Sequence, residues 1–95
     1  MKIVVFEPNG QASDLPPNAV LRSRFKVGRY FCTMTIDCGA YVPGQTSAGM
    51  MRAEWEPQLP TKLNKRAIAE YRTGRDALYA TAANVIGGRV LLAEL

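Results

Sequence analysis

Residues 64–86 are the most constraining stretch of the sequence, because their apolar side chains recur at the spacing of one helix face. At 100° per residue these side chains fall within an arc of roughly 160°. Asn64 suits the N-cap position, and Leu63 and Ile68 are placed to form a hydrophobic staple. We therefore predict an amphipathic helix at about 64–86 with one face on a core. The arc contains Leu63, Ala67, Ile68, Tyr71, Gly74, Leu78, Tyr79, Ala82, Val85 and Ile86.

Two glycines follow this helix, and Gly87 suits the left-handed conformation of a helix C-cap. Residues 89–95 then contain the apolar run Val-Leu-Leu-Ala, which is typical of an interior strand. A strand that follows a helix usually crosses over right-handedly and lies parallel to the strand before the helix. We expect this arrangement, with the last strand in the same sheet as the earlier ones.

Two stretches in the first half of the chain have the pattern of β-strands. Residues 2–7 are mostly β-branched or aromatic, until the turn sequence Pro-Asn-Gly stops them. Residues 8–19 contain three prolines and are predicted to form a surface connection. Residues 20–38 alternate in polarity, and their apolar face changes parity at Gly28, which predicts a bulge or a tight turn there.

The next segment, residues 39–47, contains Val-Pro-Gly and predicts a hairpin loop before a further alternating strand at 48–56. The elements together predict an α+β fold. Its sheet would be single-layered and mainly antiparallel, in the order β-β-β-α-β with one strand that can split in two, and the helix would pack on one face. A chain of 95 residues cannot divide its core, so residues 1–95 are expected to form one domain.

The composition is that of a folded globular protein, since 47% of the residues are hydrophobic and 21% are charged. No apolar run approaches the roughly 18 residues that a membrane span needs. The apolar start of the chain ends at Glu7, too early for a signal peptide. Cys32 and Cys38 are too far apart along an extended segment to bond to each other. We expect a cytoplasmic protein with buried, reduced thiols and no membrane contact.

Catalytic chemistry is disfavoured because the chain has no histidine. This excludes Ser-His and Cys-His pairs and any histidine-containing zinc site. Residues 44–49 are small, like those of a phosphate loop, but they lack the Gly-Lys-Ser/Thr ending, and Ser47 has no base to activate it. We predict no enzyme activity, no cofactor and no metal. A remote alternative is an enzyme that uses the tyrosines or the carboxylates Asp37, Glu54, Glu56 and Asp76.

A row of cations is the first candidate binding site in this chain of net charge +4. Arg22, Arg24 and Lys26 share one parity of a strand, and Arg29 follows them. Such a row can track phosphates while neighbouring aromatic rings stack on bases. Cations on an edge strand also prevent pairing with other molecules, and we favour this solvent-exposed interpretation.

The second candidate is Arg75, which falls inside the apolar arc of the helix. The favoured interpretation is a buried aliphatic stem with a guanidinium that reaches solvent. The alternative is a positioned cation between Tyr71 and Tyr79 that meets an acidic partner or an internal carboxylate such as Asp37. Gly74 costs the helix about 1 kcal/mol relative to alanine, which indicates a close backbone approach at this position. Trp55 is expected to belong to the core.

These features lead to two functional hypotheses. The first is a non-catalytic interaction protein that binds another protein or forms a homodimer, through an exposed sheet edge or the Arg75 region. The alternative is a nucleic-acid-binding accessory protein that uses the basic strand face.

Overall fold

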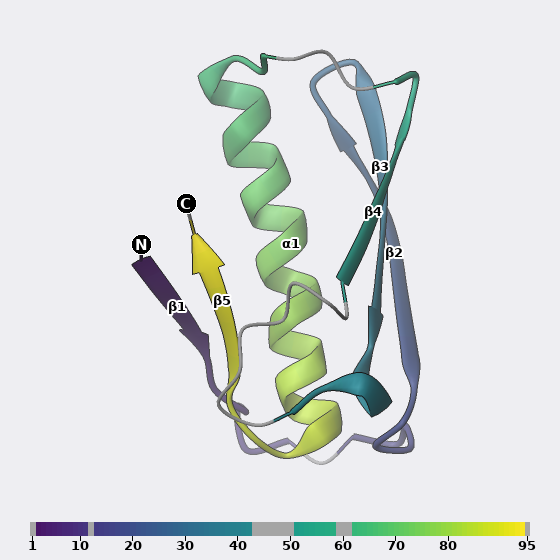
Figure 1. Cartoon of the computed structure of the whole chain (residues 1–95), viewed down its shortest axis with the longest axis vertical. Helices are drawn as coiled ribbons and strands as arrows, with labels where there is room; N and C mark the ends of the chain where they lie inside the picture. Colours follow the sequence, from purple (N-terminus) through teal and green to yellow (C-terminus); the bar gives the residue numbers. More distant parts are fainter. Residues whose placement is uncertain (1, 12, 43–50, 59–61, 95) are drawn as a thin grey trace.

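One long helix lies between two antiparallel sheets in the computed structural model of the chain, which describes residues 2–11, 13–42, 51–58 and 62–94 (Figure 1). The predicted α+β class, with antiparallel strands and a single long helix, is confirmed. The elements are β1 (Lys2–Phe6), β2 (Val20–Val27), β3 (Tyr30–Asp37), the 3-10 helix η1 (Cys38–Ala40), β4 (Met51–Glu56), α1 (Lys65–Ile86) and β5 (Val90–Glu94).

The larger sheet has the strand order β2-β3-β4, and both pairings are antiparallel. A two-residue turn joins β2 to β3, pairing Val27 with Tyr30, and Gly28 adopts a φ of 61° in it. The tight turn predicted at Gly28 is therefore confirmed. The alternation of β3 places Cys32, Met34 and Ile36 in the core, and both cysteines are buried and unbonded, as predicted.

Helix α1 begins and ends within one residue of the predicted bounds because both caps form. The Asn64 side chain accepts a hydrogen bond from the Ala67 N–H at 2.8 Å, and Gly87 has a φ of 65°. Ile68, however, is 36% exposed. In Figure 1 the start of α1 extends beyond the smaller sheet, and Ile68 on this part of the helix is only partly covered.

A close contact fixes how α1 sits on the larger sheet. A Cβ built on Gly74 would lie within 3.0 Å of three atoms of the Phe25 ring, so only glycine fits there. The close approach predicted from Gly74 is thus confirmed. Next to this contact, Trp55 packs against the core and stacks on Tyr71 with ring centroids 5.7 Å apart, which supports its predicted place in the core.

The last strand is where the predicted topology is wrong. Strand β5 does not join β4 in a parallel crossover; it pairs antiparallel with β1 in a separate two-stranded sheet, from Lys2↔Glu94 to Phe6↔Val90. The reason is that the apolar surface of α1 is wider than a single sheet can cover. Tyr79 is fully buried and stacks on Phe6 of β1, with centroids 5.3 Å apart, so a second sheet covers this side of the helix.

The predicted loop at 39–47 lies largely outside the described residues, as do residues 44–49 with Ser47. Its described start forms η1, where the Asp37 side chain accepts a hydrogen bond from the Gly39 N–H at 3.0 Å. No helix among the described residues is long and apolar enough to cross a membrane.

Candidate functional site

The two-stranded sheet β1–β5 is apolar on both of its faces. Its inner face packs on the core through half-buried Phe6 and buried Val90 and Leu92. Its outer face carries Ile3 opposite Ala93 and Val5 opposite Leu91. Ile3 is 42% exposed and Val5 is 47% exposed. We call Ile3, Val5, Leu91 and Ala93 the outer aliphatic face.

Strand β1 also has an unusual edge. Among the described strands it pairs only with β5, and Figure 1 shows it at the margin of the molecule. Its residues between Lys2 and Glu7 are all uncharged, whereas the edge strand β2 carries three cations. Charged side chains are the usual means by which proteins prevent an edge strand from pairing with other molecules. Strand β1 lacks this protection from Ile3 to Phe6, although Lys2 begins the strand and Glu7 follows it.

The predicted cation row lies on the outer face of the larger sheet, as the alternation of polar and apolar residues along β2 predicted. Arg22, Arg24 and Lys26 are all exposed there. Arg24 is engaged within the molecule, because its Nη2 lies 3.3 Å from a carboxylate oxygen of Glu56 and its guanidinium lies 4.3 Å from the centroid of the Phe31 ring. Acidic side chains of β4 share this face, so the row is partly neutralised by its own sheet.

Arg75 does not reach solvent, so the favoured interpretation of this residue is wrong. The residue is 8% exposed, its Nε donates to Asp76 at 2.9 Å, and its Nη2 donates to Glu94 at 3.0 Å. Its carboxylate partners are therefore internal, as the alternative proposed, but they come from α1 and β5 and not from Asp37. Burial by itself lowers the pKa of Arg75. The hydrogen bonds and the charges of Asp76 and Glu94 raise this pKa by more, so it lies above its ordinary value.

Glu94 ties the end of β5 to the helix and makes stability depend on pH. The hydrogen bond from Arg75 lowers the pKa of Glu94 below its ordinary value of 4.5. The stabilisation is therefore complete above that ordinary value and is lost as the pH falls through the lowered pKa of the folded state. We expect Glu94→Gln to be less stable than the wild type at neutral pH, with a difference that shrinks as the pH falls below 4.5.

Urea unfolding followed by circular dichroism across this pH range measures the effect. In an Arg75→Met background the substitution at Glu94 should lose most of its effect, because the guanidinium that lowers the pKa is gone. A difference between Glu94→Gln and wild type that stays constant with pH would contradict the assignment.

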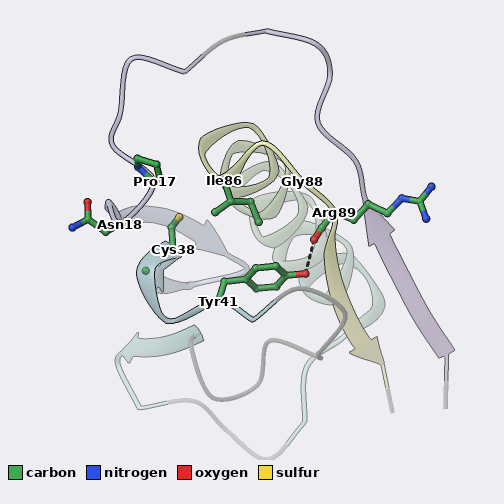
Figure 2. A pocket seen from close by; sticks show the side chains of 8 residues that line it. Pro17, Asn18, Cys38, Tyr41, Ile86, Gly88 and Arg89 are labelled. Carbon is green, nitrogen blue, oxygen red and sulfur yellow. Dashed lines mark hydrogen bonds between the residues drawn. The ribbon is translucent and has the colours of Figure 1, made fainter.

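A pocket of about 390 Å³ lies at the C-terminal end of α1 (Figure 2). Pro17, Cys38, Tyr41 and Ile86 line it, and the Tyr41 hydroxyl donates to the Arg89 carbonyl. The Arg89 side chain points away from the pocket and pairs with Glu7 at 2.8 Å. Burial, with a smaller effect of Asp37, raises the pKa of the Cys38 thiol. The pocket therefore offers mainly apolar contact and no activated nucleophile.

Within the described ranges no group of three or more cysteine, aspartate or glutamate side chains is placed to hold a metal ion. The carboxylates named for the remote enzyme alternative lie on three different elements, and only Glu54 and Glu56 share a face. Asp37 lies at the end of β3, Glu54 and Glu56 lie on the outer face of β4, and Asp76 pairs with Arg75 on the helix.

Comparisons with protein-family models, with curated proteins and with solved structures returned no match. The function must therefore be inferred from the surfaces of this molecule.

The sequence prediction missed the outer aliphatic face, although its signal was present. Residues 3–6 and 90–93 are apolar at both parities, a pattern typical of strands covered on two sides. The structure covers one side with α1 and leaves the other exposed.

Proposed function

We propose that this protein is a non-catalytic interaction protein that associates through the sheet β1–β5. The observation that carries the proposal is that this sheet is apolar on its outer face as well as on its inner face, with Ile3 and Val5 both more than 40% exposed. Burial of apolar side chains drives most protein association, and an exposed strand edge adds backbone hydrogen bonds. The unbonded cysteines fit a reducing compartment, and we place the protein in the cytoplasm.

A second copy of the chain is the occupant that the β1 edge fits best. Two copies of β1 can pair antiparallel about a two-fold axis at Val4, which sets Ile3 opposite Val5 of the second copy. Residues directly opposite in an antiparallel ladder point to the same side of the sheet. The pairing therefore brings Ile3 of each copy into contact with Val5 of the other, which buries part of both outer aliphatic faces, and it places no charge opposite a like charge. Such a self-complementary contact is what a two-fold dimer requires.

The substitution Val5→Lys tests this proposal. A lysine at a position that is 47% exposed leaves the inner face of the sheet unchanged, but it places a charge in the centre of the outer aliphatic face. We expect the wild type to be a dimer by size-exclusion chromatography with light scattering, and Val5→Lys to be a folded monomer.

Val20→Lys is the matched control, because Val20 is an exposed aliphatic residue at the start of β2 in the other sheet. It should remain dimeric. A wild type that is a strict monomer at all concentrations, or a dimer that Val5→Lys leaves intact, would refute association through this sheet.

A further inference from the structure

Five cations from three segments gather at one end of the molecule. Lys26 ends the cation row on β2, and Arg29 lies in the β2–β3 turn. Lys62 shortly precedes α1, and Lys65 and Arg66 are its first two residues. In Figure 1 the turn and the helix start are at the top. We call these five residues the basic pole. All are exposed, and the ion pairs found among the described residues involve none of them.

The basic pole is hollowed, and each hollow has cations on its rim. One hollow, of about 440 Å³, is lined by Arg29 and Lys62 together with Gly28 and Asn64. The next, of about 350 Å³, shares Gly28 and Asn64 and is lined by Lys26 and Arg66. The two hollows are therefore adjacent.

A third hollow continues this track along the seam between β2 and α1. It has a volume of about 430 Å³ and begins at the same pair of cations, Lys26 and Arg66, before it reaches Gly74. The three hollows form a path with cations at its start and middle, and such a path suits an extended ligand better than a single ion.

The carboxylate that lines these hollows does not neutralise the pole. Glu70 lines two of them, and its Oε1 accepts a hydrogen bond from the Gly28 N–H at 3.3 Å. With five cations and one carboxylate, the pole keeps an excess of four positive charges. The cation row on β2 differs, because Glu56 pairs with its Arg24 and Glu54 lies on the same face.

We propose that the basic pole binds the phosphate backbone of a nucleic acid. A nucleic acid presents closely and regularly spaced negative charges, which match adjacent hollows that each carry a pair of cations. An anionic membrane fits less well. The apolar residues that line the first hollow, Tyr30, Leu63 and Ala67, are buried or half-buried. The third hollow adds half-buried Phe25 and the exposed but short side chain of Ala69, so no large apolar side chain of the hollows is free to insert into lipid. Contacts to phosphates make the binding independent of base sequence. This site is separate from the outer aliphatic face.

Two double charge reversals test the proposal. Arg29→Glu with Lys62→Glu removes the cation pair of the first hollow, and Lys26→Glu with Arg66→Glu removes the pair that the second and third hollows share. The matched control is Arg22→Glu with Arg52→Glu, which changes the net charge equally at two exposed arginines on the outer face of the larger sheet. Binding is measured by fluorescence anisotropy with a labelled single strand and a labelled duplex, at about 50 to 200 mM salt. Circular dichroism verifies that each variant is folded.

We expect the wild type to bind, with an affinity that falls linearly with salt on logarithmic axes. Each pole variant should weaken binding at least tenfold and make the salt slope shallower by about two, while the control changes affinity much less. Three results would overturn the proposal. The wild type could fail to bind at the lowest salt, the pole and control variants could lose affinity equally, or only the control variant could lose affinity. Tighter, pole-dependent binding to vesicles of anionic lipid than to either oligonucleotide would also overturn it.

Discussion

Tyr79→Ala is expected to destabilise the fold by about 3–5 kcal/mol, the cost typical of removing a large buried aromatic ring. Tyr79 is fully buried, and its ring stacks on Phe6 with centroids 5.3 Å apart. It lies on the side of α1 that the second sheet covers. Truncation would therefore leave a cavity between the helix and β1 and remove one of the contacts that dock the smaller sheet on the helix.

Urea unfolding monitored by far-ultraviolet circular dichroism measures this loss through the shift in midpoint. Phe31→Ala is the matched control, since it removes an aromatic ring that is 40% exposed on the outer face of β3. It should cost no more than about 1 kcal/mol, mostly from the lost contact with Arg24. If the two substitutions cost the same, the ring of Tyr79 is not buried as described.

Gly74→Val is expected to cost about 2 kcal/mol, although valine favours a helix slightly more than glycine does. The new side chain would overlap the Phe25 ring, because even a Cβ at this position lies within 3.0 Å of three ring atoms. Either the ring or the helix must then move, and both are packed against the core. Overpacking therefore outweighs the gain in helix propensity.

Two further variants separate this clash from a general effect of valine in α1. Ala77→Val places the same side chain on the exposed face of the helix and should cost only a few tenths of a kcal/mol. Phe25→Ala frees the space that the new side chain needs, so the double variant should be more stable than the sum of the two single losses predicts. If the losses in unfolding free energy of the two single variants are strictly additive in the double variant, the side chains at positions 74 and 25 do not compete for space.

The sequence predicted those parts of the fold that depend on local signals. Asn64 and Gly87 cap a helix through their own side chain and backbone, and Gly28 makes a turn through its own φ. The division of the strands into two sheets has no such signal. This division depends on how much of the α1 surface each sheet covers. It also depends on the pairing of β1 with β5, which joins residues as far apart in the sequence as Lys2 and Glu94.

The candidate sites were predictable to different degrees for the same reason. The parity of β2 correctly placed Arg22, Arg24 and Lys26 on an exposed face. The basic pole could not be found this way, because Lys26 and Arg66 line one hollow although 40 positions separate them in the sequence. Glu94 was also missed as a partner of Arg75, since it reaches this residue only through the packing of β5 on α1.

The pairing of β1 with β5 has a consequence for the order in which the molecule folds. The β2–β3 hairpin and α1 form from residues that are close together in the sequence. The β1–β5 ladder joins residues that are far apart in the sequence, so its formation has the largest loop-closure cost in entropy. We therefore expect this ladder to be the last unit to close in folding and the first to open, and its amides to exchange with solvent first. A second copy that pairs with β1 adds hydrogen bonds to this least stable unit. Association and the final step of folding then become one equilibrium, in which protein concentration itself contributes to stability.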